Sequence, residues 1–170
     1  MNLKKITISS LLLAIGLVLY QVMPPIFFGM KPDVLLAMMF IAILVTKDYK
    51  MALLIGLAAG NLTAATTTFP GGQIPNIVDK FITCNCVYLM AKLTDKFNNQ
   101  IRMFIISIIG TLISGFVFLG TASLLFGLPG SASFATLMLI VVVPATIINT
   151  VACLVLYNAV DLALKRTSHQ

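Results

Sequence analysis

Two acidic and two basic residues stand in polar segments that flank long apolar stretches of this sequence: Lys31 with Asp33, and Asp79 with Lys80. Charges beside apolar stretches are energetically expensive and are therefore candidates for a functional site. A ligand with both a carboxylate and an ammonium group would match this set. Lys31 or Lys80 would hold its carboxylate, and Asp33 or Asp79 its ammonium group. An amino acid is the obvious class of ligand.

The same charges also have a purely structural interpretation. Pro32 can be the first residue of a helix, with Asp33 favoured in its first turn by the helix dipole. The Asn76-x-x-Asp79 spacing resembles a capping box with Asp in place of Glu. The charges can also pair between the two segments: Lys31 with Asp79, and Asp33 with Lys80. The two interpretations are compatible, because paired charges can still line a pocket.

Polar and aromatic neighbours of these charges are further candidate ligand contacts. Gln73 and Asn76 can supply oriented hydrogen bonds. The hydroxyls of Thr66 and Thr67 can face a cavity, although such hydroxyls more often bond to carbonyls of their own helix. Three rings are candidate contacts for an aromatic ligand: Phe27, Phe28 and Phe69.

Residues for catalysis and metal binding are scarce. The chain has no glutamate, one histidine (His169) at its penultimate position, and no P-loop motif. Its three cysteines, Cys84, Cys86 and Cys153, all fall inside apolar runs and lack the spacing of a metal site. We therefore predict no catalytic residue, no metal site, no cofactor and no enzyme activity, and we interpret the cysteines as buried apolar residues.

The composition identifies the class of protein that must position these residues. Of 170 residues, 59% are hydrophobic and 9% charged, and the mean hydropathy is +1.05. Soluble domains average about 45–50% apolar and about 25% charged residues. The sequence therefore excludes a soluble globular domain and a disordered chain. It predicts a single integral membrane domain over residues 1–170.

Charges and turn-forming residues divide the chain into six apolar stretches: 6–23, 34–46, 51–69, 77–91, 103–126 and 134–164. They predict an all-α protein with six transmembrane helices. The second and fourth stretches are short for a bilayer of about 30 Å, so each must extend into a flanking loop or tilt among longer neighbours. The last stretch is long and contains Pro144, where we expect a kink or break.

Basic residues mark one side of the predicted bundle. Nine of the eleven lie at the termini or after the second and fourth stretches: Lys4, Lys5, Lys47, Lys50, Lys92, Lys96, Arg102, Lys165 and Arg166. By the positive-inside rule, both termini and these two loops are cytoplasmic. The net charge of +6 is therefore a topology signal, and we expect no nucleic-acid partner.

Small residues indicate sites of close helix packing. Gly56 and Gly60 form a GxxxG motif in the third stretch, and Ser10 and Ala14 have the same spacing in the first. Either pair can serve internal packing or dock another membrane protein. Asn61 and Asn149 lie within apolar stretches, where an amide should face the bundle interior and either bond to a neighbouring helix or contact a ligand.

The two charged segments also carry a family resemblance. Gly29-Met30-Lys31-Pro32-Asp33 and Phe69-Pro70-Gly71-Gly72-Gln73-Ile74-Pro75-Asn76-Ile77-Val78-Asp79-Lys80 resemble the signature loops of the bacterial tryptophan transporter family. Members of that family resemble the substrate-binding S components of energy-coupling factor (ECF) transporters. The resemblance implies an S-component-like bundle in the bacterial plasma membrane. It also implies capture of tryptophan from outside, under the loops that follow helices 1 and 3.

The resemblance further implies an energising partner. S components dock on a membrane T component that couples to two ATPases, and typically carry an Ala-x-x-x-Ala docking motif in their first helix. Ser10 and Ala14 stand at the matching place, with Ser for the first Ala. Two alternatives remain at this point: the same architecture for a vitamin or another amino acid, and a membrane scaffold without a substrate.

Overall fold

The structure is a computed structural model that describes residues 3–25 and 31–168, and every regular element in this part of the chain is helical. The elements are α1 (Leu3–Val22), α2 (Val34–Thr46), α3 (Tyr49–Thr66), α4 (Gln73–Leu93), α5 (Asn99–Leu125), η1 (Pro129–Ser131), α6 (Phe134–Leu137), η2 (Met138–Val142) and α7 (Val143–Ser168). α6, η2 and α7 form one run, so each of the six predicted apolar stretches coincides with a helix. Three of these, α1, α5 and the run Phe134–Arg166, are long and apolar enough to cross a membrane.

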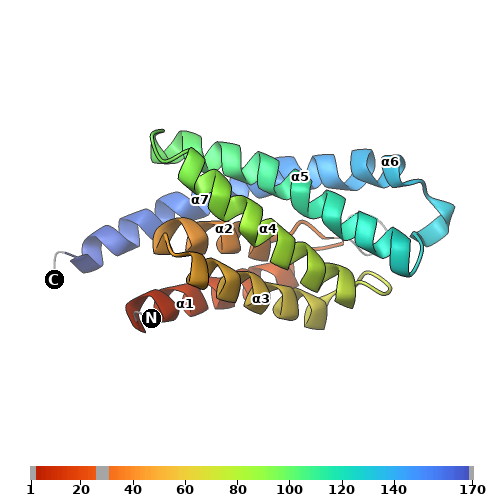
Figure 1. Ribbon diagram of the computed structural model, residues 1–170, viewed down its shortest axis with the longest axis horizontal. Helices are drawn as coiled ribbons and strands as arrows, with labels where there is room; N and C mark the ends of the chain where they lie inside the picture. Colours follow the sequence, from red (N-terminus) through yellow and green to blue (C-terminus); the bar gives the residue numbers. More distant parts are fainter. Residues whose placement is uncertain (1–2, 26–30, 169–170) are drawn as a thin grey trace.

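The helices run back and forth along the long axis of the molecule (Figure 1). Both termini lie at one end, together with the α2–α3 and α4–α5 connections, whereas the connections that follow α3 and α5 lie at the other. This is the arrangement that six antiparallel passes require. Six membrane crossings, and the side of the membrane that each end faces, stay predictions.

α2 is the centre of the bundle. It contacts α1, α3, α4, α5 and α7, and nearly all of its side chains are buried. Its 13 residues span about 20 Å, which is less than the thickness of a bilayer core. A short stretch was expected either to extend into a flanking loop or to tilt among longer helices. α2 does not extend beyond the predicted stretch, and it lies among longer helices.

Local caps fix the ends of α2. The Asp33 Oδ1 atom accepts a hydrogen bond from the Leu36 amide at 2.9 Å, so Asp33 is the N-cap. The expectation that Pro32 would be the first helical residue is therefore wrong. At the other end, Lys47 adopts a left-handed conformation with φ 49°, and its amide bonds to the Ile43 carbonyl. The chain turns there directly into α3.

Glycines allow α3 and α4 to pack closely. A Cβ atom added at Gly56 would lie 2.4 Å from the Cys84 Sγ atom, and one at Gly60 would lie 3.1 Å from the Ile77 Cα atom. The GxxxG motif is thus an internal packing surface against α4 and not a docking face. Cys84 and Cys153 are buried, as predicted, whereas Cys86 is partly exposed.

The last helical run is irregular just before Pro144. Proline has no amide hydrogen and cannot donate to the carbonyl four residues earlier. The preceding residues Met138–Val142 form a π-helical segment, in which the Val143 amide bonds to the Met138 carbonyl. The Thr146 hydroxyl donates to the Val142 carbonyl at 2.7 Å and satisfies another acceptor near the irregularity. The run therefore does not break at Pro144, and the irregularity near this proline is the π-helical segment.

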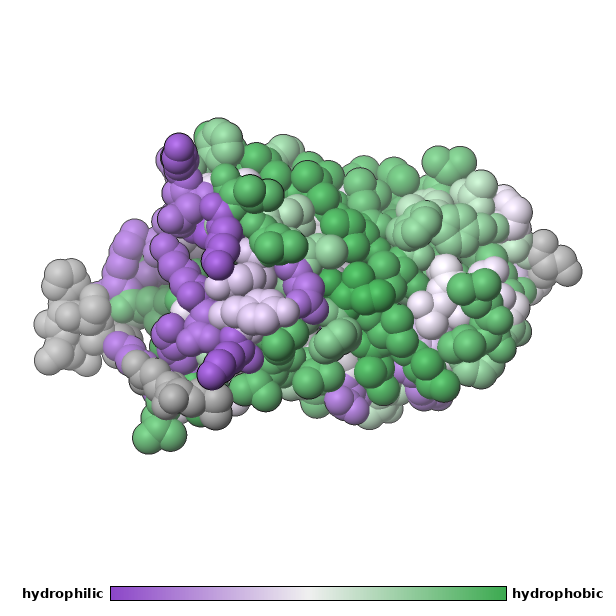
Figure 2. Space-filling model, viewed as in Figure 1, coloured by the Kyte–Doolittle hydropathy of each residue, from purple (hydrophilic) through white to green (hydrophobic). Residues whose placement is uncertain are grey.

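Hydrophilic residues gather at the end of the molecule that holds the termini (Figure 2). Ion pairs connect elements there: Lys5 with Asp48, Lys47 with Asp95, and Arg102 with Asp95. Asp48 also caps α3, and the hydrogen bond from the Met51 amide lowers the pKa of its carboxyl group. The rest of this view is mostly apolar, as expected of a surface that faces lipid.

Candidate binding site

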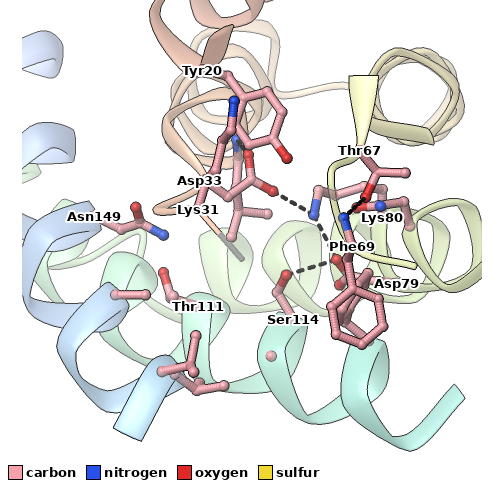
Figure 3. Close-up of a pocket in the computed structure, with 17 residues that line it drawn as sticks. Tyr20, Lys31, Asp33, Thr67, Phe69, Asp79, Lys80, Thr111, Ser114 and Asn149 are labelled. Carbon is pink, nitrogen blue, oxygen red and sulfur yellow. Dashed lines mark hydrogen bonds and ion pairs between the residues drawn. The ribbon is translucent and has the colours of Figure 1, made fainter. Parts of the chain in front are cut away.

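A cavity of about 90 Å³ lies between the helices (Figure 3), toward the end of the bundle that holds the connection between α3 and α4. Side chains from α1, α2, α4, α5, η2 and α7 line it, together with residues of the two segments that precede α2 and α4. One wall carries the charges. The polar and charged lining residues are Tyr20, Lys31, Asp33, Thr67, Asn76, Asp79, Lys80, Thr111, Ser114 and Asn149.

Lys80 connects two carboxylates at this wall. Its Nζ atom lies 2.6 Å from Asp33 Oδ2 and 2.6 Å from Asp79 Oδ2. The side chains of Lys80 and Asp79 are 2% and 1% exposed, whereas that of Asp33 is 18% exposed. Asp33 is therefore the member of the triad that solvent or a ligand reaches most readily. The predicted pairing of Asp33 with Lys80 is confirmed, but Asp79 pairs with Lys80 rather than with Lys31.

Two hydroxyl groups donate hydrogen bonds to the carboxylate of Asp79. Its Oδ1 atom accepts a hydrogen bond from Thr83, one helical turn later, and its Oδ2 atom accepts one from Ser114 of α5, both at 2.8 Å. A buried carboxylate needs such partners because desolvation is expensive unless every lone pair is used. The triad thus fastens α4 to the start of α2 and to α5.

Asn76 does not take part in a capping box, because α4 begins three residues earlier, at Gln73. The Asn76 side chain is buried and donates to the Gly72 carbonyl at 2.7 Å. Asp79, one turn further along, serves the triad and not the helix end. The capping-box interpretation of this segment is therefore wrong.

Lys31 is placed differently from Lys80. It is half-buried, and its Nζ atom lies 5.5 Å from the centroid of the Tyr20 ring, which is a cation–π contact. Among the residues that the structure describes, no carboxylate lies within 4.0 Å of this ammonium group. Lys31 therefore brings a positive charge to the cavity that is not already committed to an acid.

Apolar side chains form the rest of the lining. Phe69 packs edge-to-face on Phe118, with the ring centroids 5.2 Å apart. Leu36, Gly115, Val141, Val142 and Ala145 continue this surface. The cavity thus has a charged wall and an apolar wall. Among residues 3–25 and 31–168, no group of three or more His, Cys, Asp or Glu residues is placed to hold a metal ion.

The structure brings together most of the residues predicted from the sequence. The cavity is lined by Lys31, Asp33, Thr67, Phe69, Asn76, Asp79 and Lys80. Gln73 is exposed in the first turn of α4, and the Thr66 hydroxyl donates to the Leu62 carbonyl of its own helix, so neither lines the cavity. Phe27 and Phe28 lie outside the described residues.

Other lining residues were not singled out by the sequence. Tyr20, Thr111 and Ser114 are ordinary residues in a membrane helix, and only the packing of α1 and α5 brings them to the cavity. The three-residue spacing of Thr111 and Ser114 was the available signal, since it puts both on one face of α5. Asn149 lines the cavity, whereas Asn61 is exposed and bonds to its own helix at Leu57, contrary to the expectation that it faces the interior.

Ser10 and Ala14 lie away from the cavity. Both are exposed on α1. Ser10 borders a groove between α1 and α3 that Leu13, Leu54 and Ala58 also line. A docking role for this pair stays a prediction.

Comparisons with known proteins give a consistent result. The family model described as "Tryptophan transporter TrpP" matches residues 2–165. A "Probable tryptophan transport protein" of Clostridium acetobutylicum is 52% identical over 97% of this chain and 96% of its own length. Proteins with the same name from Clostridium perfringens and Bacillus subtilis are 46% and 40% identical, over 98% and 99% of this chain and 96% of each relative. No solved structure matches.

Proposed function

The chain belongs to the tryptophan transporter family, and from that premise we propose that it captures tryptophan from the outer side of the membrane in the cavity described above. It is a multi-pass transport protein of the bacterial plasma membrane and not an enzyme. The observation that carries the proposal is the buried Lys80, held between Asp33 and Asp79 in the lining of a cavity that also has apolar side chains.

The charges of the cavity suit a zwitterion. The triad carries a net charge of −1, and Lys31 restores neutrality without pairing with an acid. In our proposal, the ammonium group of tryptophan binds at Asp33, the most accessible of the two acids, and its carboxylate binds at Lys31. Asp79 and Lys80 hold Asp33 in place, and Thr67 and Asn76 border the same wall.

The apolar wall suits the indole ring. Phe69 and Phe118 offer an aromatic edge and face, and Val142 lies on the same lining. At about 90 Å³ the cavity is smaller than the 300–1,000 Å³ that is typical of ligand pockets. We therefore expect the walls to move apart when tryptophan binds.

Calorimetric titration of the purified protein with tryptophan tests the proposal. We expect saturable binding that Lys31→Gln weakens at least about tenfold, because the variant lacks the charge that holds the carboxylate. Gln73→Ala is the control, since Gln73 is exposed and does not line the cavity. Unchanged affinity in Lys31→Gln would exclude the charge-based site. Binding of a vitamin or another amino acid in place of tryptophan would identify a different substrate.

Delivery into the cell is the second part of the proposal. The chain has no P-loop, so an ECF-type T component with its two ATPases would supply the energy and dock on α1 at Ser10 and Ala14. Both side chains are small and exposed, which permits the close approach of another helix.

An Ala14→Leu substitution separates docking from capture. We expect it to abolish tryptophan uptake by cells and to leave binding to the purified protein unchanged, because the bulkier side chain blocks helix–helix approach far from the cavity. Ser123→Leu, at an exposed small residue of α5, is the matched control and should transport normally. Normal uptake by Ala14→Leu would contradict docking at this face.

A further inference from the structure

Two buried polar atoms in the cavity lining have no hydrogen-bond partner in the described structure: Thr111 Oγ1 and Asn149 Oδ1. Most buried polar atoms of folded proteins are hydrogen-bonded, because an unsatisfied one carries the full cost of its desolvation. Nearby hydroxyls of α7 follow that rule, since Thr146 and Thr150 each donate to a carbonyl of their own helix. Thr111 and Asn149 are exceptions, and they occur together.

The two side chains belong to different helices that face each other across one part of the cavity. Thr111 extends from α5 and Asn149 from α7, and both are directed toward the space between them (Figure 3). The triad of Asp33, Asp79 and Lys80 lies on another side of the same cavity (Figure 3). A ligand that extends across the cavity from the charges would place its other end at Thr111 and Asn149.

The surroundings of this pair select the kind of group that binds there. Val141, Val142 and Ala145 line the cavity beside it, and no charged lining residue belongs to α5, η2 or α7. An ammonium group would lose its hydration here without gaining a counter-ion, which is unfavourable. A neutral N–H donor on an apolar ring loses little hydration free energy here, and it satisfies an acceptor that is otherwise unpaired.

We propose that Thr111 and Asn149 form a specificity subsite that accepts a hydrogen bond from the indole N–H of the substrate. The inference rests on the proposed function, because it assumes that the ligand is tryptophan with its charged end at Lys31 and Asp33. It predicts that the site distinguishes an indole from other aromatic rings of similar size. Stacking on Phe69 and Phe118 alone would accept any such ring.

A substrate analogue without the donor tests the subsite. In 3-benzothienylalanine, sulfur replaces the indole N–H while the ring and the amino acid part keep their shape. We expect the purified wild-type protein to bind tryptophan about 10- to 100-fold more tightly than this analogue in calorimetric titrations. Thr111→Val and Asn149→Leu should each reduce the preference to a few-fold by weakening tryptophan binding while leaving analogue binding nearly unchanged.

Thr150→Val is the matched control, because its hydroxyl is bonded within α7 and the residue does not line the cavity. It should keep the wild-type preference. If wild-type protein binds tryptophan and the analogue equally, or if both subsite variants keep the full preference, the subsite is excluded and tryptophan capture stands. If folded wild-type protein binds no tryptophan, the proposed function fails and the subsite fails with it.

Discussion

Lys80 is the residue on which the geometry of the cavity depends most. It is almost completely buried and forms ion pairs with two carboxylates, that of Asp79 in α4 and that of Asp33, the N-cap of α2. Removing one partner from a buried ion pair leaves an uncompensated charge and costs about 3–5 kcal/mol. An exposed lysine contributes far less to the free energy of unfolding, because water and salt screen its interactions. The two kinds of lysine in this chain should therefore respond very differently to substitution.

We predict that Lys80→Met lowers the free energy of unfolding by about 3–5 kcal/mol and abolishes tryptophan binding and uptake. The triple variant Lys80→Met with Asp33→Asn and Asp79→Asn should recover much of the stability, since no unpaired charge remains, but should not bind. Unfolding in detergent and calorimetric titration measure the two effects. Lys92→Met is the control, because Lys92 is exposed near the end of α4. Wild-type stability of Lys80→Met would contradict the buried triad.

The charged part of the site was predictable from the sequence, whereas the neutral part was predictable only in part, through Thr67, Phe69 and Asn76. Asp33, Asp79 and Lys80 are conspicuous because a charge beside an apolar stretch needs a reason to be there. Ser114 completes the coordination of Asp79, but a serine in a membrane helix usually bonds to its own backbone and gives no such signal. Its role follows from how α5 packs on α4, and no spacing within one helix contains that information.

At the scale of helices, the contact between α3 and α4 depends on the absence of side chains. The Gly56 backbone lies so close to Cys84 that even a methyl group would overlap it. The same contact aligns α4, which carries Asp79 and Lys80, with the rest of the bundle. Separation of these two helices should therefore disturb the cavity as well as the fold.

Gly56→Ala should destabilise the protein by about 1–3 kcal/mol and weaken tryptophan binding, because the added Cβ atom would lie 2.4 Å from Cys84 Sγ and force α3 and α4 apart. Gly120→Ala is the matched control in α5: nothing lies within 4 Å of its added Cβ atom, and alanine is the better helix former. That variant should be as stable as wild type or more so. Equal thermal stability of the two variants would mean that the packing of α3 on α4 is not tight.

Helix positions were predicted well where charge or chain geometry limits them. The stretch 34–46 has the same bounds as α2, because Asp33 caps one end and Lys47 turns the chain at the other. The start of α4 was predicted four residues late, at 77, because the polar residues Gln73 and Asn76 were left outside the apolar stretch. Pro75 lies in the first turn of α4, where backbone amides have no helical acceptor and the missing donor does no harm.

For the whole molecule, the distribution of charge predicts its orientation in the membrane. The hydrophilic end contains the termini and the loops between α2 and α3 and between α4 and α5. By the positive-inside rule we expect this end to face the cytoplasm and the segment between α3 and α4 to face outward. The cavity then lies toward the outer side, from which an uptake system receives its substrate.

Cysteine labelling of intact cells tests this orientation. In a chain whose cysteines at 84, 86 and 153 are replaced by alanine, we expect a membrane-impermeant maleimide to label Gln73→Cys and not Lys96→Cys. Both positions are exposed. Gln73 is the first residue of α4, and Lys96 lies just beyond its last residue, Leu93. Permeabilised cells provide the control, since both variants should then react. Labelling of Lys96→Cys alone in intact cells would reverse the topology.

The central position of α2 also has a consequence for how the protein is made. α2 is synthesised second but contacts α7, which leaves the ribosome last. Until then α2 has lipid or translocon in place of α7, and at about 20 Å it is too short to hold Asp33 and Lys47 both in water. The packing environment that α2 has in the folded protein exists only once α7 has been synthesised. A chain that stops before α7 should therefore be a substrate for membrane proteases, even though α1 to α6 are present.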